Sequence, residues 1–240
     1  MNCFLEQPQL PSAAVSTVVI GARYFNEFAA KLDAFGVETW SISGPACLDE
    51  RLRDHADLLL LHCGKERFMA AEDIILHNNI YIYNYVNLMA NDAALNICTF
   101  GPYWLGSPEY AAWRPDDMIR ISVRQRYARC SSCIVDEQSI ITSDRGIAKA
   151  AKEHGVDVLL INPGHILLDG FNYGFIGGAS FKLAPDKLAF TGSLRHHPDE
   201  ERINAFLEKR RIVPVCLSSG PLRDIGSAVL IHEKIQPPLP

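Results

Sequence analysis

A strand–turn–strand–helix–strand unit recurs along this chain, and it constrains the fold more than any single residue does. The unit is clearest over residues 130–161, where two short β-branched strands flank a polar turn at 136–139. A helix follows, which residues 142–144 can cap and Gly155 can end. The apolar run at 158–161 is typical of a strand buried on both faces. A unit of this size that recurs predicts a repeat architecture.

Weaker copies of the unit lie on both sides of this stretch. An amphipathic helix at 25–35 lies between predicted strands at 15–20 and 37–42, and another copy covers 187–217. The strand that opens the unit is predicted at five places, including runs at 56–61, 93–99, 176–182 and 227–231. The fifth opening strand lies at the C-terminus, whereas the rest of its unit lies at the N-terminus. We therefore predict an α/β fold, a five-fold pseudosymmetric α/β-propeller of ββαβ modules closed by the N- and C-terminal segments.

Composition is consistent with this architecture. A chain of 240 residues that is 48% hydrophobic suits one sizeable domain, so we expect a single domain over residues 1–240. The alternative is an ordinary α/β sandwich in which the likeness among short strands is accidental, because short apolar runs are ambiguous.

Charge and cysteine content limit the partners. A net charge of −5 with only small basic clusters argues against a nucleic-acid partner. No apolar run is long enough to span a membrane, and the N-terminus lacks the pattern of a signal peptide. Seven scattered cysteines indicate free thiols in a reducing cytoplasm. We expect a monomer or small homo-oligomer that needs no cofactor.

Cys130 and Cys133 form a Cys-x-x-Cys pair that leads into a strand. A redox pair would begin a helix, and a zinc site would need a second ligand pair, so we expect no metal. Two interpretations stay open. The pair can be small buried thiols, or one of them can be a catalytic nucleophile, in which case a lowered thiol pKa is expected.

His55 and Asp57 are candidates for acid–base chemistry. Two residues apart on a strand, they would face the same side, and the carboxylate could orient the imidazole. The alternative is a solvated polar pair before a strand. Asp224, in the turn before the last opening strand, could bind a cationic group, pair with Arg223 or cap a turn.

Small and polar residues near the predicted axis are candidates for ligand binding. Gly177 and Gly178 in an opening strand indicate either steric crowding or a backbone lining that admits a ligand. Ser180 could then offer its hydroxyl to that ligand. Asn96 and Asn172 are candidate polar lining residues by the same reasoning.

The segments Ser131–Ile161, Gly174–Leu194 and Asp224–Leu230 resemble the pentein superfamily, and are most similar to an uncharacterised bacterial branch of clostridial type. That superfamily includes arginine and agmatine deiminases, amidinotransferases and non-catalytic ribosome anti-association factors. The resemblance implies a five-bladed α/β-propeller. In its enzymes it implies a cysteine nucleophile, a histidine acid–base and carboxylates that bind a guanidinium group.

The chain departs from the enzymes of that superfamily at two places. Their cysteine begins the last opening strand, but here residues 223–226 follow the turn at 219–221 and contain no cysteine. Residues 177–180 stand where a His-x-Asp pattern is expected. We therefore expect a protein that binds a small polar or cationic ligand in the central cavity without the usual triad. The alternatives are a Cys-dependent hydrolase or transferase acting on an amidino or guanidino group, and a non-catalytic scaffold for a protein partner.

Overall fold

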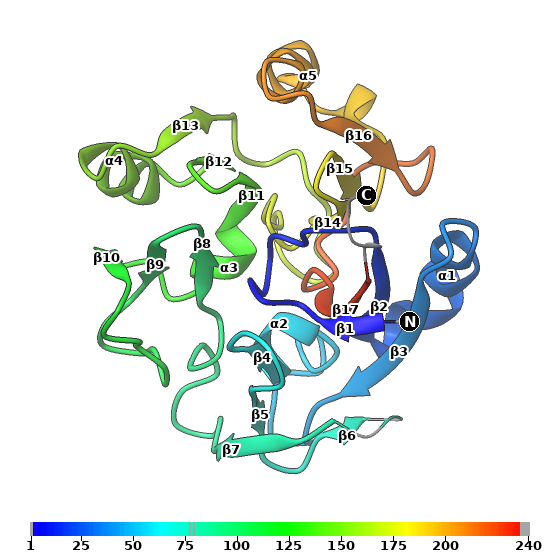
Figure 1. Cartoon of the computed structure of the whole chain (residues 1–240), viewed down its shortest axis with the longest axis vertical. Coiled ribbons are helices and arrows are strands. Elements are labelled where there is room, and N and C mark those ends of the chain that lie inside the picture. Colours follow the sequence, from blue (N-terminus) through cyan, green and yellow to red (C-terminus); the bar gives the residue numbers. More distant parts are fainter. Residues whose placement is uncertain (1, 77, 79, 236–240) are drawn as a thin grey trace.

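Five small sheets lie around a common centre in the computed structural model, which describes residues 2–76, 78 and 80–235 (Figure 1). In each sheet the opening strand pairs antiparallel with a middle strand, and the middle strand pairs parallel with an outer strand. This order, found five times, confirms the α/β class and the five predicted units. It also rules out a sandwich of two stacked sheets.

Four of the sheets are built from strands that follow one another along the chain. Named from the opening strand outward, they are β4 (Leu60–His62), β5 (Phe68–Ala71) and β7 (Ile82–Val86); β8 (Cys98–Phe100), β9 (Tyr103–Gly106) and β10 (Ile119–Ser122); β11 (Ser132–Asp136), β12 (Ser139–Thr142) and β13 (Asp157–Leu160); and β14 (Ser180–Ala184), β15 (Lys187–Phe190) and β16 (Val213–Cys216).

The fifth sheet joins the two ends of the chain. Its opening strand β17 (Val229–Lys234) pairs with β2 (Val15–Gly21), which pairs with β3 (Glu38–Ser43). Val229 lies opposite Val19, more than 200 residues earlier in the sequence. Two short strands extend this sheet, β1 (Asn2–Phe4) beside β17 and β6 (Ile75–Leu76) beside β3. The predicted sharing of one module between both chain ends is therefore present.

Helices cross from the middle to the outer strand in three modules. These are α1 (Ala22–Asp33), α4 (Arg145–Glu153) and α5 (Glu200–Glu208), the last preceded by the 3₁₀ turn η1 (Leu194–His196). They lie on the outside of the ring (Figure 1). No helix occupies 107–118 or the described part of 72–81, so the helix of the ββαβ unit is replaced by extended chain and turns in two modules. No helix in the described part of the chain has the length and apolar character that crossing a membrane requires.

Local chemistry sets the ends of α4 as the sequence predicted. The Asp144 side chain accepts a hydrogen bond from the Ile147 amide at 2.8 Å, which caps the helix, and Gly155 adopts a φ of 81° just beyond its end. Helix α1 differs from its prediction, because it begins three residues earlier and buries Tyr24 and Phe28 against the sheet. Phe35, the last residue of the predicted amphipathic helix, lies beyond the observed helix and is 45% exposed.

Three opening strands begin later and are shorter than predicted, because the chain makes a turn before each of them. Residues 56–59 form a short helix, α2 (Ala56–Leu59), and another, α3 (Ala128–Ser131), precedes β11. The strands predicted at 93–99 and 176–182 are also turns at first, and their strands begin only at residues 98 and 180. The backbone groups of these turns bond to the neighbouring modules instead of to a strand partner.

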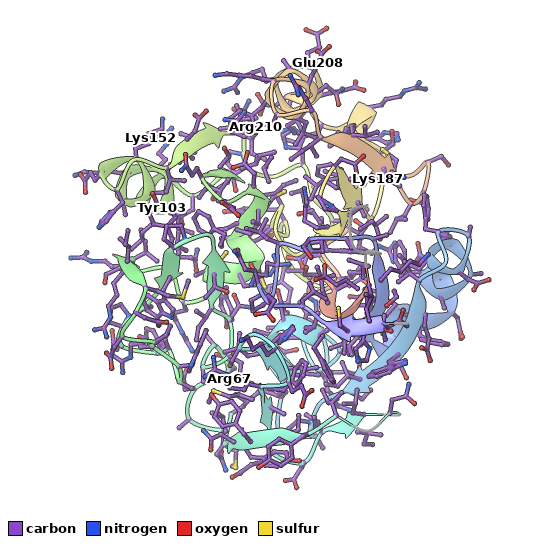
Figure 2. All side chains as sticks on the ribbon, in the orientation of Figure 1. Arg67, Tyr103, Lys152, Lys187, Glu208 and Arg210 are labelled. Atoms are coloured by element: carbon purple, nitrogen blue, oxygen red, sulfur yellow. The ribbon has the colours of Figure 1, made fainter. Side chains whose placement is uncertain are left out.

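Neighbouring modules also bond at the rim of the ring. Arg210, which follows α5, donates to the Ser139 hydroxyl at 2.6 Å and pairs with Asp136 and Asp157 of the adjacent module. Its guanidinium group lies 3.6 Å from the centre of the Phe206 ring. Figure 2 shows Arg210 between α4 and α5, where it bridges two consecutive modules of the ring.

Candidate functional site

Five turns meet near the centre of the ring and are joined by a closed circuit of hydrogen bonds. The Asp57 amide donates to the Gly226 carbonyl, and the Asn96 side chain donates to the Asp57 carbonyl. The Cys130 amide donates to the Asn96 side-chain oxygen at 3.1 Å, and the Gly178 amide donates to the Cys130 carbonyl. The amides of residues 225 and 227 donate to the Gly178 carbonyl. Each module thus fixes the turn of the next one, and the side chains on these turns face a shared space.

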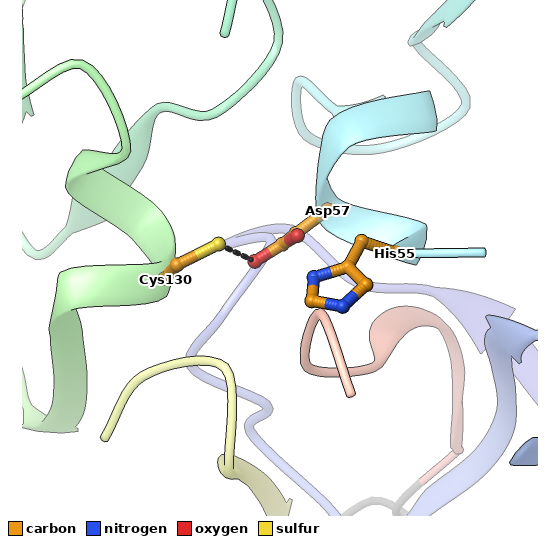
Figure 3. Close-up of side chains that lie close together, drawn as sticks. All are labelled: His55, Asp57 and Cys130. Atoms are coloured by element: carbon orange, nitrogen blue, oxygen red, sulfur yellow. Dashed lines mark hydrogen bonds between the residues drawn. The ribbon is translucent and has the colours of Figure 1, made fainter. Parts of the chain in front are cut away.

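Three side chains on these turns converge, as Figure 3 shows: His55, Asp57 and Cys130. The Cys130 thiol donates to Asp57 Oδ2 over a distance of 2.9 Å. Asn96 Nδ2 donates to the Cys130 sulfur at 3.1 Å, so the sulfur is held from two sides. His55 precedes α2, and its Nδ1 lies 3.8 Å from Asp224 Oδ1.

These groups are buried, and two of their polar atoms are left free. His55, Asp57, Cys130 and Asp224 are each at most 3% exposed. Among the residues that the structure describes, His55 Nε2 and Asp57 Oδ1 have no hydrogen-bond partner. A buried polar atom without a partner is costly, which makes these two atoms candidates for ligand contact.

The site raises the pKa of the Cys130 thiol well above its usual range. Burial is the main cause, and the nearby carboxylates of Asp57 and Asp224 raise this pKa further. Burial also raises the pKa of Asp224, although His55 opposes that shift. Cys130 is therefore a protonated thiol in this structure, and the lowered pKa expected of a nucleophile is not found.

The absence of a side chain at Gly178 leaves room for the Asp224 carboxylate. Asp224 Oδ2 accepts the Phe175 amide at 2.9 Å, and Oδ1 accepts the Gly226 amide at 3.0 Å. A Cβ atom on Gly178 would lie 1.9 Å from Asp224 Oδ1. A Cβ on Gly177 would lie 2.6 Å or less from three backbone carbonyl oxygens. Close packing therefore accounts for both glycines.

A cavity of about 320 Å³ opens beside this cluster. His55, Cys130 and Asp224 lie in its wall, and Asn172 lies among the lining residues. The rest of the lining is apolar or aromatic: Leu52, Leu58, Tyr127, Leu168, Phe171, Tyr173 and Phe175. The cavity therefore combines a buried polar end with an apolar remainder, as binding sites for small molecules do.

The remaining predicted site residues have other surroundings. Cys133 is fully buried in a hydrophobic core cluster, and burial raises its pKa to about 11. The Ser180 hydroxyl donates to the Ile176 carbonyl at 2.7 Å. Both ends of the Asn96 amide bond to protein groups, so Asn96 positions Cys130 from within the circuit. Of the two cysteines, only Cys130 joins the cluster.

Two features of the site were not predicted from the sequence. One is Arg129, which is buried beside Cys130 and donates to the Ser227 hydroxyl at 2.6 Å. The other is the aromatic lining, which Phe171, Tyr173 and Phe175 contribute from one loop. Three aromatic residues at alternate positions, shortly before Gly177, are a pattern from which this lining could have been inferred.

The cluster also offers donor atoms for a metal ion. One ligand atom each from His55, Asp57 and Cys130 lies within 4.8 Å of the others. Imidazole, carboxylate and thiolate suit zinc, but Cys130 would first have to lose the proton that it donates to Asp57.

Comparison with known proteins agrees with this architecture. Residues 19–229 match a family described as "Family of unknown function (DUF6873)", and no curated protein matches the chain. Among solved structures, the inosamine-phosphate amidinotransferase StrB1 from Streptomyces griseus superposes with a TM-score of 0.60 at 10% identity, covering 97% of this chain and 98% of that chain.

A second solved structure gives the same result. The amidinotransferase SxtG of the saxitoxin biosynthetic pathway from Microseira wollei has a TM-score of 0.52 at 11% identity, covering 88% of this chain and 91% of that chain. At such low identity the similarity establishes the fold alone. The chain belongs to the DUF6873 family of unknown function, and its fold is that of the pentein superfamily.

Proposed function

We propose that this protein binds a small amidinium or guanidinium cation in the cavity and that Cys130 attacks the central carbon of that cation. The observation that carries the proposal is the convergence of a thiol, an imidazole and the Asp224 carboxylate in the wall of one cavity, with the Asp57 carboxylate bonded to the thiol. The solved structures with the same fold include two amidinotransferases, which is consistent with chemistry at such a carbon.

The charges of the site favour a cation. Asp57 and Asp224 are both buried, and no lysine or arginine lies among the described residues that line the cavity. A cation in the cavity beside Asp224 offsets the mutual repulsion of the two carboxylates. The same cation counteracts their effect on Cys130, so its binding lowers the pKa of the thiol and creates the thiolate when the substrate is present.

The chemical step follows from the hydrogen bonds already in place. The Cys130 sulfur forms a bond to the amidinium carbon, and the thiol proton passes to Asp57, to which it is already donated. The bond from this carbon to one nitrogen then breaks, and that nitrogen leaves as ammonia or an amine after taking up a proton. Water then replaces the sulfur, which releases an amide or a urea and regenerates the thiol; an amine in place of water gives group transfer.

His55 is the group placed to handle the proton of the leaving nitrogen. It lies in the cavity wall, and its Nε2 has no partner among the described residues. Asp224 lies 3.8 Å from the other ring nitrogen and can orient the imidazole. This arrangement assigns the acid–base role to His55 and the orienting role to Asp224.

The nucleophile proposed here lies in a different module from the usual one. Enzymes of the pentein superfamily are expected to carry their cysteine at the last opening strand, where this chain has Asp224 and Gly226. The circuit of turns brings all five modules to the same space, so a thiol on α3 reaches a cavity that residue 224 also lines.

A pair of alkylating reagents tests the proposal. 2-Chloroacetamidine and 2-chloroacetamide both alkylate thiols by displacing chloride, but only the amidine is a cation. Peptide mass spectrometry gives, for each cysteine, the ratio of its alkylation rate by the amidine to its alkylation rate by the amide. We expect this ratio to be at least about tenfold higher at Cys130 than at the exposed Cys216. Cys133→Ser should preserve this preference, and Asp57→Asn should reduce it. Equal preference at Cys130 and Cys216 would refute cation recognition by the cavity.

Binding without reaction is the second candidate, and the raised pKa of Cys130 favours it. Ammonia release from a panel of amidines and guanidines separates the two functions. Turnover that Cys130→Ser abolishes supports the enzyme. Amidine-dependent thermal stabilisation that is unchanged in Cys130→Ser, with no ammonia released, supports the binding protein.

A further inference from the structure

The outer part of the cavity indicates what the substrate carries besides its cationic group. Seven of its lining side chains are aliphatic or aromatic without a charge: Leu52, Leu58, Tyr127, Leu168, Phe171, Tyr173 and Phe175. Phe171 is 40% exposed and Tyr173 is 44% exposed, although both lie on the loop that borders a cavity. Exposed aromatic side chains around an apolar cavity are typical of a surface that a ligand covers.

The arginines that contact this aromatic lining are already paired. Arg51 lies over the Phe171 ring, with 4.2 Å between its guanidinium carbon and the ring centre, and donates to Asp49 and to the Gly170 carbonyl. Arg126 lies over the Tyr127 ring and donates to Asp92 at 2.6 Å.

The buried Arg129 is directed elsewhere. Its guanidinium group donates to the Ser227 hydroxyl and to two backbone carbonyls, and it does not line the cavity. Among the described residues, then, the cavity wall offers no lysine or arginine that could receive a carboxylate or a phosphate on the substituent, and His55 lies at the end assigned to the cationic group.

We infer that the substrate is an amidine or guanidine whose substituent is apolar, such as an aryl group, and not one that carries a carboxylate or a phosphate. This inference rests on the proposed function, because it assigns the polar end of the cavity to the cationic group. An acidic substituent would lie against the apolar lining without a lysine or arginine as counter-ion, and such a placement is disfavoured.

The size of the cavity sets the size of the substituent. About 320 Å³ lies at the low end of the volumes that hold small ligands. One ring or a short branched alkyl chain fills the space beyond the cationic group. The T-shaped arrangement of Tyr173 and Phe175, with ring centres 6.4 Å apart, leaves aromatic edges and faces to pack against such a ring.

Protection of Cys130 from 2-chloroacetamidine tests the inference. The competitors are acetamidine, which has almost no substituent; benzamidine, which has an aryl group; and L-arginine, which has a carboxylate. The readout is the concentration that halves the alkylation rate of Cys130. We expect benzamidine to protect at a concentration about tenfold lower than acetamidine, and L-arginine to protect more weakly than acetamidine.

Three variants locate the effect. Phe171→Ala should remove most of the advantage of benzamidine and leave acetamidine unchanged, whereas Phe35→Ala, which alters another exposed aromatic residue, should change neither. Arg51→Met should leave all three values unchanged. If L-arginine instead protects as well as benzamidine, and Arg51→Met abolishes that protection, Arg51 binds the carboxylate and the inference is overturned.

The outcomes separate this inference from the proposed function. If acetamidine protects but benzamidine is no better, the cavity recognises the cation and the substituent inference fails. If no amidine protects and 2-chloroacetamidine shows no preference for Cys130, the proposed function fails and the inference fails with it.

Discussion

Replacing Gly178 with alanine should strongly destabilise the protein, because this position allows two turns of the circuit to touch. The added Cβ would lie 1.9 Å from Asp224 Oδ1 and 2.4 Å from Asp224 Cγ. Such atoms are rarely closer than 3.0 Å, so the carboxylate or the turn has to move by at least about 1 Å.

Neither movement is cheap. Shifting Asp224 weakens its hydrogen bonds from the Phe175 and Gly226 amides, and bonds to a carboxylate contribute about 1.5 kcal/mol each. Overpacking strain adds about 1–3 kcal/mol. We expect a loss of about 4 kcal/mol in the free energy of unfolding, which for a chain of this length lowers the midpoint of thermal unfolding by roughly 8–16 °C.

Gly220 provides the matched control, because a Cβ there would meet only the Ser218 hydroxyl at 3.9 Å and Gly220 does not have a positive φ. Gly220→Ala should change stability by less than about 0.5 kcal/mol. Thermal unfolding followed by circular dichroism measures both variants. A Gly178→Ala midpoint within about 2 °C of the wild type would show that the turns do not pack as closely as described.

Two further predictions concern the same region. Asn96→Ala should lower the free energy of unfolding by about 2–5 kcal/mol, because the buried amides of Arg129 and Cys130 lose their hydrogen-bond acceptor. It should also abolish the preference of Cys130 for the amidine reagent. A stability and a labelling ratio equal to those of the wild type would contradict this prediction. The free energy of unfolding should also fall above pH 9, because burial raises the pKa of the Cys133 thiol to about 11 in the folded protein. Between about pH 9 and pH 11 the thiol is deprotonated in the unfolded chain but still protonated in the native one. The free energy of unfolding therefore falls by about 1.4 kcal/mol per pH unit in this range. Cys133→Ala should remove the part of this pH dependence that comes from the Cys133 thiol, so the thermal unfolding midpoint of the variant should fall less than that of the wild type between pH 8.5 and 10.5. Equal falls would show that the buried thiol does not contribute.

The modular order of the chain could be predicted because it is recorded in local patterns. The Asp144 cap and Gly155 mark the ends of one helix whatever the rest of the chain does. The position of the fifth opening strand at the C-terminus followed from counting copies of the unit, and its pairing with β2 agrees with that count. Such features depend on a few neighbouring residues, so a sequence contains enough information to place them.

The cluster at the centre was predicted only in part. His55 and Asp57 were paired on the assumption of an extended strand, but they lie at the start of α2. Asp57 and Cys130 are 73 residues apart, and they touch because the ring brings their turns together. Spacing along the chain carries no information about such a contact.

The choice between Cys130 and Cys133 also depends on tertiary structure. Cys130 is in α3, where the Asn96 side chain accepts its amide and holds its sulfur, whereas Cys133 is in β11 and enters the core. A four-residue helix has too few hydrogen bonds of its own to be stable. Its presence, and so the direction of the Cys130 side chain, is set by a neighbour from another module.

The pairing of β17 with β2 has a consequence for how this protein is made. Asp224, which lines the cavity, is followed a few residues later by the strand that must return to residues 15–21. During synthesis, the earlier modules emerge before either the last turn or its strand is available. Pairing across so long a stretch of chain is slow, because the loop between the partners has to close first. We therefore expect the cavity to be among the last parts of the molecule to assemble, so that a ligand binding there would distinguish finished molecules from incompletely folded ones.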